Sequence, residues 1–443
     1  MTTANPERTR PRRFEVPRLP ASVPGLRPRL AHAVATGRAG AQVRPRSWFG
    51  SLRAALDRPL TSYYLLLGAS ALLLTIGLVM VLSASSVYSY EVNDGDSYAV
   101  VRRQLVWVLL GLPLAWFASR LPHRWIRRLA YPGFSISLVL LLLTAFFGVE
   151  RNGNQNWLGV GPLVIQPSEI AKLAMVIWAA HIYANKERRL DSTHEIVVPV
   201  VPGMILATGL VVLGNDLGTA LVLFALLLGS LWVVGAPRRF FTVMISVVAV
   251  GLLMLVATNA ERLGRVTTFV DPFNDYHDKG WQPAHGLYAL STGGLFGQGI
   301  GASQQKWGDL PEAHTDFIFA VLGEELGLAG TLLVILLFLT IAFAALRVAR
   351  RTADPFVRYT SFGIVVWLLG QMIINVGMVL ALLPVIGIPL PLISYGGSAL
   401  LPSLMALGLL VGFARREPEA ARALAQRKKL RSAGLSAQSR ASR

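Results

Sequence analysis

The chain has 443 residues and a formal net charge of +18; 53% of its residues are hydrophobic and only 15% are charged. The mean hydropathy of +0.52 is too apolar for a soluble protein of this size and predicts a polytopic membrane protein. The chain has no cysteine, which excludes disulfides, thiolate metal sites and thiol chemistry. The Lys and Arg residues lie mainly in short loops and the two tails, as membrane topology requires, so we expect no nucleic-acid partner.

The two ends of the chain are predicted to be basic tails. Residues 1–60 are rich in Arg and Pro and lack the apolar core of a cleavable signal peptide. We expect them to form a disordered cytoplasmic tail, with binding to a membrane surface or a partner as the alternative. Residues 415–443, which contain an Arg-Lys-Lys run, carry the same expectation.

Between the tails, residues 61–414 are predicted to form an all-α membrane domain of about ten transmembrane helices. The predicted spans, whose ends are good to several residues, are 61–82, 104–119, 126–147, 167–183, 197–213, 217–234, 241–258, 317–346, 362–383 and 399–413. A long polar loop, residues 259–316, separates the seventh and eighth helices.

The distribution of positive charge predicts the orientation. Arg and Lys concentrate in the loops RLPHRWIRR, NKERRL, PRR and RVARRTADPFVR, whereas the alternate loops are acidic or uncharged. With both termini cytoplasmic, most of the 42 Lys and Arg residues fall on the cytoplasmic side. The long polar loop then faces outside the cell, where ATP and nucleotide sugars are not direct substrates.

The stretch from Gly293 to Gly327 contains the sequence LPEAHTDFIFAVLGEELG and stands out by its charge. Glu312, His314 and Asp316 directly precede an apolar run, where ionisable side chains are costly unless they are used. Partial desolvation raises the pKa of a carboxyl group and suits it to general-base catalysis, so Asp316 is the candidate base, with helix capping as the alternative. We expect Glu312 and His314 to shape its surroundings, and His314 to form hydrogen bonds rather than ligate a metal.

Two more charged sites lie near the ends of predicted spans. Glu169 and Lys172 are three positions apart on one helix face, close enough to pair. Both a structural ion pair and a functional pair are compatible with that spacing. Asp216, in GNDLGTA, is predicted to cap the sixth span, and a capping residue can serve a site at the same time.

The connection between the ninth and tenth spans, ALLPVIGIPLPLISYGGSALLPSL, is almost wholly apolar, but its prolines and paired glycines forbid a continuous helix. Broken backbone at membrane depth is tolerated only where protein buries it or where it lines a wet cavity. We therefore predict a re-entrant or pocket-lining element. Its candidate pocket residues are Ser394, Tyr395, Gly396 and Gly397.

Four motifs in one order, QPSEIAKLA, DLGTALVL, LPEAHTDFIFAVLGEELG and PLPLISYGGSALL, resemble the SEDS family of bacterial cell-wall proteins. The resemblance covers about residues 62–416 and leaves only the tails. It is strongest to the cell-division branch of that family in its actinobacterial form, with the elongation branch as the alternative.

The resemblance implies a peptidoglycan glycosyltransferase of the bacterial cell membrane that polymerises lipid II and releases polyprenyl diphosphate. The implied partners are a class B penicillin-binding transpeptidase and other divisome proteins at the division septum. The family's catalytic aspartate falls on Asp316, its helix Glu and Lys fall on Glu169 and Lys172, and its DLGT aspartate falls on Asp216.

The implied reaction needs no nucleotide, because lipid II carries its own diphosphate leaving group. We expect Asp316 to deprotonate the 4-hydroxyl of the acceptor GlcNAc, which attacks the donor in one inverting displacement. Charge on the diphosphate is expected to be stabilised by Lys172, by Arg102 or Arg103, or by a divalent cation, Mg²⁺ or Mn²⁺. Many family members have a basic residue where Asn156 stands, which puts a phosphate contact there in doubt.

Two other functions stay open: a transporter that flips lipid II, and a non-catalytic scaffold that recruits a transpeptidase. Ten spans, a broken helix and buried charges serve a flippase equally well. The clustering of ionisable residues toward the outer face favours an enzyme over a flippase. The presence of Asp316, Glu169, Lys172 and Asp216 weighs against a scaffold.

Overall fold

The computed structural model describes residues 58–151, 154–160, 163–257, 272–273, 280–308 and 310–426, and the statements below refer to these ranges. Residues 1–57 and 427–443 of the predicted tails lie outside them. So do residue 258 and residues 259–271, 274–279 and 309 of the long polar loop. The predictions made for those segments stay predictions.

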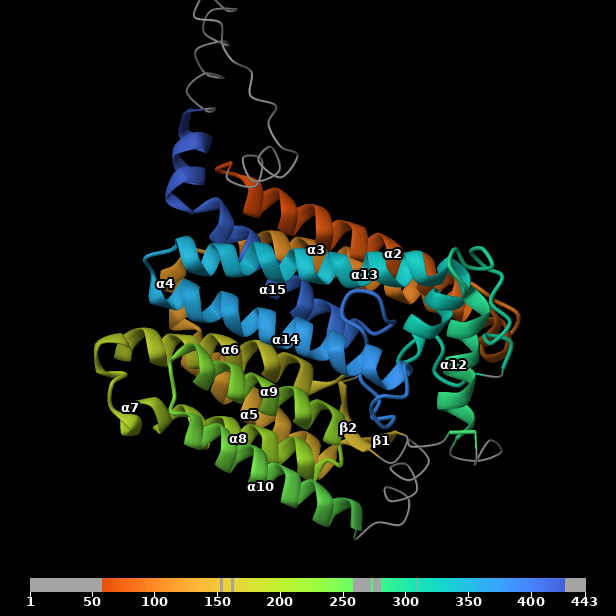
Figure 1. The fold of residues 1–443 in the computed structure, drawn as a ribbon, viewed down its shortest axis with the longest axis horizontal. Helices are drawn as coiled ribbons and strands as arrows, with labels where there is room; N and C mark the ends of the chain where they lie inside the picture. Colours follow the sequence, from red (N-terminus) through yellow and green to blue (C-terminus); the bar gives the residue numbers. More distant parts are fainter. Residues whose placement is uncertain are drawn as a thin grey trace, which may run out of the picture. The chain divides into compact units, whose positions relative to one another are not determined.

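Long helices that run side by side make up most of the described structure (Figure 1). Within the described ranges, those of 14 or more residues are α2 (Thr61–Val92), α3 (Ala99–Arg120), α5 (Ala130–Phe147), α6 (Pro167–Lys186), α8 (Val200–Leu213), α9 (Leu217–Val233), α10 (Arg238–Ala257), α13 (Ile318–Arg351), α14 (Pro355–Val379) and α15 (Gly397–Arg415). The shorter ones include α4 (His123–Arg128), the 3₁₀ helix η1 (Glu187–Arg189), α7 (Thr193–Val197) and α12 (Trp281–Gly293), and residues 418–426 are also helical.

Each predicted span overlaps one of the long helices over most of its length, so the predicted α-helical membrane architecture is confirmed. By length and composition, seven stretches of the described chain can cross a membrane: Thr61–Val92, Ala99–Arg120, Ala130–Phe147, Thr193–Leu213, Ile318–Arg351, Pro355–Val379 and Gly397–Arg415. α9 is apolar but shorter. The chain is a multi-pass membrane protein.

Two helices extend beyond their apolar runs. α2 continues to Val92, ten residues past the predicted end, because its polar last turns still complete the helical hydrogen bonds. α14 begins at Pro355 rather than at residue 362. The Asp354 carboxylate caps it by accepting a hydrogen bond from Phe356 N–H (3.0 Å), and proline suits the first helical position.

A small antiparallel sheet in the loop before α6 was not predicted. Strands β1 (Val149–Arg151), β2 (Asn154–Val160) and β3 (Leu163–Ile165) pair in the order β1-β2-β3. The backbone N–H of Gln155 donates to the Gly214 carbonyl (2.9 Å), which ties β2 to the turn between α8 and α9. The sheet therefore brings the start of α6 and the start of α9 together.

α13 is interrupted at Gly327, whose φ of 66° and ψ of −166° are not helical. The loop after α12 supplies hydrogen-bond partners at the break: Gln298 N–H donates to the Glu324 carbonyl (2.9 Å), and Leu328 N–H donates to the Gly294 carbonyl (2.9 Å). Backbone groups freed by a kink need such partners in an apolar surrounding. The first turns of α13 are therefore joined to the long polar loop.

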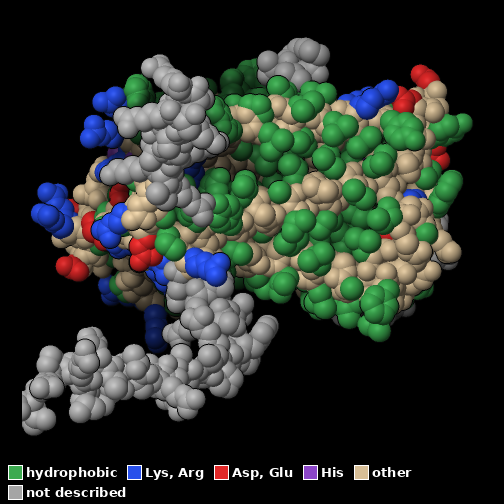
Figure 2. Space-filling view, turned by 90° about the horizontal axis from the view of Figure 1, so that it is seen from above, with side chains coloured by type: hydrophobic (Ala, Val, Ile, Leu, Met, Phe, Trp, Pro, Cys, Tyr) green, Lys and Arg blue, Asp and Glu red, His purple; other side chains and the backbone are tan. Residues whose placement is uncertain are grey.

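Charge and hydrophobicity are separated on the surface. In Figure 2, most of the visible Lys and Arg side chains gather at one end of the molecule, and hydrophobic side chains are spread broadly over the rest. Large apolar side chains such as Leu109, Phe146 and Leu336 are more than 60% exposed along the helices. An apolar exterior of this extent is the surface expected against lipid rather than water.

Candidate active site

The connection between α14 and α15, residues 380–396, is non-helical, as predicted, and its second half is mostly buried; we call this connection the broken segment. Leu390, Leu392 and Ile393 are at most 3% exposed. A Cβ added at Gly77, midway along α2, would lie only 2.4 Å from the Leu392 carbonyl oxygen. α15 begins at Gly397, which packs against the Trp107 ring. The broken segment therefore folds back among the helices at membrane depth.

The residues before Asp316 are hydrogen-bonded to this broken segment. Ser394 Oγ donates to the Thr315 carbonyl at 2.6 Å, and Tyr395 N–H donates to the His314 carbonyl at 3.0 Å. Two of the motifs recognised in the sequence, which are about 80 positions apart, thus meet directly. The contact fixes the backbone that carries the candidate base.

The Asp316 carboxyl group is partly buried beside Gly387. A Cβ at that glycine would lie 3.3 Å from Asp316 Oδ2, and its φ of 70° favours glycine. Burial, and then the negative charges of Glu312 and Asp216, raise the pKa of Asp316 to about 7. The capping alternative for Asp316 is wrong, because the N-cap of α13 is Phe317 and no side chain caps it. The carboxyl group is therefore poised to exchange a proton near neutral pH.

The two neighbours predicted to shape this surrounding differ in their contacts. The His314 ring stacks on Tyr88 with centroids 4.8 Å apart and lies 5.7 Å from the Tyr395 ring. Burial lowers the pKa of His314, which favours its neutral form. Glu312 is exposed and accepts a hydrogen bond from Thr315 Oγ1 (2.5 Å). His314 is thus part of an aromatic cluster, and Glu312 shapes the turn before the candidate base.

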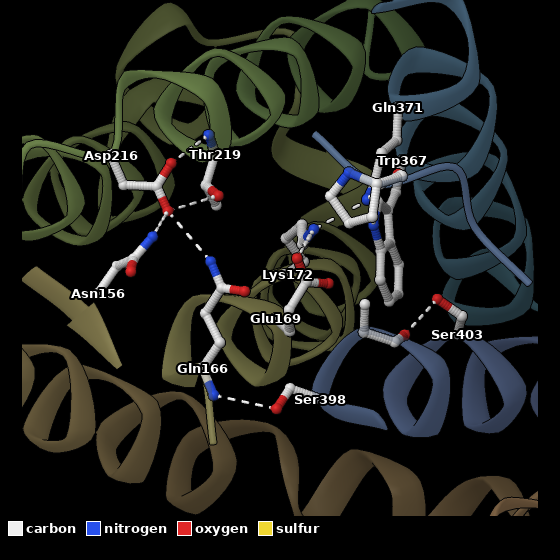
Figure 3. Close-up of polar contacts among 12 residues, drawn as sticks. Asn156, Gln166, Glu169, Lys172, Asp216, Thr219, Trp367, Gln371, Ser398 and Ser403 are labelled. Carbon is white, nitrogen blue, oxygen red and sulfur yellow. Dashed lines mark hydrogen bonds and ion pairs between the residues drawn. The ribbon is translucent and has the colours of Figure 1, made fainter. Parts of the chain in front are cut away.

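Glu169 and Lys172 form the predicted pair inside the bundle (Figure 3). Lys172 Nζ lies 2.6 Å from Glu169 Oε1, and both side chains are at most 2% exposed. The ammonium group also donates to Gln371 Oε1 at 3.1 Å and lies 5.6 Å from the centre of the Trp367 ring. Glu169 Oε2 is buried without a hydrogen-bond partner in the described part of the chain. The pair is therefore enclosed by protein, which is compatible with both interpretations of it.

Asp216 caps α9, as predicted. Its carboxylate accepts hydrogen bonds from the N–H and the Oγ1 of Thr219, both at 2.9 Å. Asn156 Nδ2 (2.9 Å) and Gln166 Nε2 (3.2 Å) donate to the same carboxylate, and Gln166 N–H donates to Ser398 Oγ (3.2 Å), as Figure 3 shows. Asn156, in the position where many family members are basic, thus bonds to Asp216. Together with Gln166, these bonds connect the sheet, α6, α9 and α15.

Arg103 lies near the start of α3 with its side chain exposed. Its Nη2 donates to Asn93 Oδ1 at 3.0 Å. The next residue, Gln104, is buried, accepts from Gly396 N–H (3.2 Å) and donates to the Ser394 carbonyl (3.4 Å). An exposed guanidinium therefore stands next to the residue that ties α3 to the broken segment.

Comparison with known proteins identifies the family. The family model described as cell cycle protein, which groups FtsW, RodA and SpoVE, matches residues 63–419. The chain belongs to the FtsW/RodA/SpoVE family.

Individual relatives of the FtsW/RodA/SpoVE family agree with this assignment. The chain is 42% identical to the probable peptidoglycan glycosyltransferase FtsW of Mycobacterium tuberculosis over 383 residues, which are 86% of this chain and 72% of the relative. It is 37% identical to the stage V sporulation protein E of Bacillus subtilis, covering 79% of this chain and 96% of that protein.

Solved structures show the same fold. A chain of the complex in "Structural coordination of polymerization and crosslinking by a peptidoglycan synthase complex" superposes with a TM-score of 0.66 at 29% identity, over 80% of this chain and 97% of that chain. The rod shape determining protein RodA of Thermus thermophilus superposes with a TM-score of 0.57 at 28% identity, over the same shares of the two chains.

Several residues of this candidate site were missed in the sequence. Gln104, Gln166, Gln371 and Asn375 are amide side chains that bond to the broken segment, to Asp216 or to Asp316. A usable signal was present, since buried amides in apolar helices are costly unless they are hydrogen-bonded. The partners of each amide depend on the tertiary packing and are not visible in the sequence.

The described side chains do not form a binding site for the predicted divalent cation. In the described ranges, no group of three or more His, Asp or Glu side chains is arranged to hold a metal ion. Mg²⁺ commonly binds through one or two carboxylates together with substrate phosphates. A cation that arrives with the diphosphate stays a prediction.

Proposed function

We propose that this chain is a peptidoglycan glycosyltransferase that polymerises lipid II during septal cell-wall synthesis, with Asp316 as the general base. The observation that carries the proposal is the Asp316 carboxyl group, partly buried, with a pKa raised to about 7, on backbone held by the broken segment. Membership of the family and the FtsW relative at 42% identity support the activity and the role in division.

The proposed reaction is a single displacement. Asp316 takes the proton from the 4-hydroxyl of the acceptor GlcNAc, and the oxygen attacks the anomeric carbon of the donor. The bond from that carbon to the diphosphate oxygen breaks, polyprenyl diphosphate leaves, and the anomeric centre inverts. One carboxylate is sufficient because no covalent glycosyl-enzyme intermediate forms.

The leaving diphosphate needs positive charge nearby. Arg103 supplies an exposed guanidinium, which suits bidentate bonding to phosphate oxygens. Lys172 is 1% exposed and already bonded to Glu169, so we assign it an electrostatic influence from inside the protein and assign the contact with the diphosphate to Arg103.

The proposed orientation places both termini in the cytoplasm and Asp316 outside it. Asp316 directly precedes α13, and the last turn of that helix carries Arg350 and Arg351, so the candidate base and these arginines lie at opposite ends of a 34-residue helix. The gathering of Lys and Arg at one end in Figure 2 supports that end as cytoplasmic.

The proposed partner is a class B penicillin-binding transpeptidase, together with other divisome proteins. It is supported by the structural match to a chain of a peptidoglycan synthase complex that coordinates polymerisation and crosslinking. An elongation role is the alternative within the family, because the RodA and stage V sporulation protein E relatives also match over most of the chain.

A liposome experiment separates the proposed enzyme from a flippase and from a scaffold. The protein is reconstituted with its transpeptidase and labelled lipid II, and glycan polymer and lipid translocation are measured separately. We expect the wild type to form polymer and Asp316→Asn to form almost none. Translocation without any polymer would favour a flippase, and the absence of both activities would favour a scaffold.

A further inference from the structure

α14 carries two amide side chains one helical turn apart, Gln371 and Asn375. Each is at most 1% exposed. Four positions of helix separate them by about 6 Å along the axis and place them on one face. Neither lies in the four motifs that indicated the family, and the reaction described above does not use them.

Asn375 joins the backbone of the candidate base to the broken segment. Its Nδ2 donates to the Asp316 carbonyl (2.8 Å) and to the Ile388 carbonyl (2.7 Å). An amide nitrogen has two protons, so both are used. The Oδ1 of Asn375 is buried without a hydrogen-bond partner among the described residues. The bonds that this side chain does make are thus directed at Asp316 and the broken segment.

Gln371 joins the buried ion pair to the adjacent peptide of the broken segment. Its Oε1 accepts from Lys172 Nζ (3.1 Å) and from Trp367 Nε1 (2.8 Å), and its Nε2 donates to the Pro389 carbonyl (3.0 Å), as Figure 3 shows for the first two. Two donors on one atom identify that atom as the amide oxygen, because the amide nitrogen does not accept.

We propose that Gln371 and Asn375 are positioning residues for glycosyl transfer. Through the carbonyls of neighbouring Pro389 and Ile388, they hold Asp316 and the Glu169–Lys172 pair in one fixed arrangement. The inference rests on the proposed function, because it takes Asp316 as the base. A base has to stay within hydrogen-bond reach of the acceptor hydroxyl, and a displacement of about 1 Å can cost on the order of 100-fold in rate.

The two side chains have different expected effects. Asn375 touches the backbone of Asp316 directly, so its loss lets the carboxyl group move out from beside Gly387 and become more solvated. Gln371 contacts Lys172 and does not contact Asp316, so its loss disturbs the ion pair and leaves the titration of Asp316 in place. The charges that act on Asp316, those of Glu312 and Asp216, are the same in both variants.

The test uses the full chain with its transpeptidase and the variants Asn375→Leu, Asn375→Ala and Gln371→Leu. The first readout is kcat and KM for lipid II polymerisation. The second is the pH dependence of carbodiimide labelling of Asp316, followed by mass spectrometry, which reports protonation without turnover. Ile364→Ala is the matched control, because Ile364 is fully buried on α14, seven positions before Gln371, and has no polar contact.

We expect both Asn375 variants to lower kcat at least tenfold with KM within about threefold, and to shift the labelling midpoint to lower pH. Asn375→Ala covers the case in which Asn375→Leu does not fold, since the smaller side chain fits the same site, removes both donors and adds no charge. Gln371→Leu is expected to lower kcat without moving the midpoint. Ile364→Ala is expected to lower Tm and to leave both the midpoint and kcat near their wild-type values.

The inference would be overturned if both Asn375 variants had the kcat and the labelling midpoint of the wild type. The inference would also be overturned if Ile364→Ala lost as much kcat, and shifted the midpoint as far, for each degree of Tm lost as the Asn375 variants do. A wild-type protein that makes no polymer would instead contradict the proposed function, while the labelling of Asp316 would still report whether Asn375 holds it.

Discussion

Asp316 carries a carboxyl group whose proton affinity is set by its surroundings. Burial and two neighbouring acids raise its pKa to about 7, so a large fraction of the protein holds a proton on Asp316 at neutral pH. A general base works only in its deprotonated form. The activity should therefore depend on pH near neutrality, far above the range in which an ordinary aspartate titrates.

The polymerisation rate is predicted to fall as the pH drops through about 7, because Asp316 then takes up a proton. Removing one neighbouring charge by Glu312→Gln lowers the pKa of Asp316, so this variant should keep a larger fraction of its maximal rate at pH 6 than the wild type. Glu150→Gln, at another exposed acid, is the control. A wild-type rate that is flat from pH 5.5 to 8.5 would contradict the prediction.

The residues that were found in the sequence are those whose chemistry is unusual for their position. Asp316, Glu169, Lys172 and Asp216 are charges in or beside apolar helices, and such charges are rarely idle. The sequence did not predict Asn375 and Gln371, because an amide side chain inside a helix is only mildly unusual. Their importance lies in the carbonyls that they meet, which belong to segments distant in the sequence.

The elements that meet at the site depend on a few local devices. Asp216→Ala removes the cap of α9 and leaves Asn156 and Gln166 without their acceptor, so it should lower the free energy of unfolding by about 2 kcal/mol. Asp216→Asn keeps an acceptor for Thr219 and should cost less than about 1 kcal/mol. Thermal or denaturant unfolding in detergent measures both, and equal losses would contradict the capping role.

The break in α13 is a second device. Gly327→Ala places a Cβ 2.4 Å from the backbone nitrogen of Gly297, at a φ and ψ that only glycine adopts readily. We expect a loss of about 2 kcal/mol or more, visible as a lower Tm. Gly251→Ala in α10 is the matched control, since nothing lies within 4 Å of a Cβ there. An unchanged Tm for Gly327→Ala would mean that the break is not required.

Element prediction succeeded where a long apolar run exists and failed where it does not. The ten spans were visible because each helix presents apolar residues to lipid or to its neighbours. The strands β1, β2 and β3 have three to seven residues, too few for a periodic signal to separate them from a loop. The early start of α14 was missed for a related reason, because its first two turns lie outside the apolar run.

The proposed reaction requires the site to open outside the cell. The chain has no native cysteine, so single cysteines can be labelled without background. Ser291→Cys, exposed on α12, should react with a membrane-impermeant maleimide in intact cells. Arg188→Cys, exposed in η1 just after the C-terminal end of α6, should react only after lysis. The reverse pattern would place Asp316 in the cytoplasm and contradict the proposed orientation.

The role of Asp316 as general base is tested by the initial rate of lipid II polymerisation by Asp316→Asn, reconstituted with its transpeptidase. Because a positioned general base contributes about 10²–10⁴-fold, the rate should fall by that factor while Tm stays near the wild-type value. Asp94→Asn is the matched control, an exposed aspartate whose positive φ asparagine tolerates, and it should keep the wild-type rate. A folded Asp316→Asn protein that polymerises lipid II within about threefold of the wild type would contradict the account.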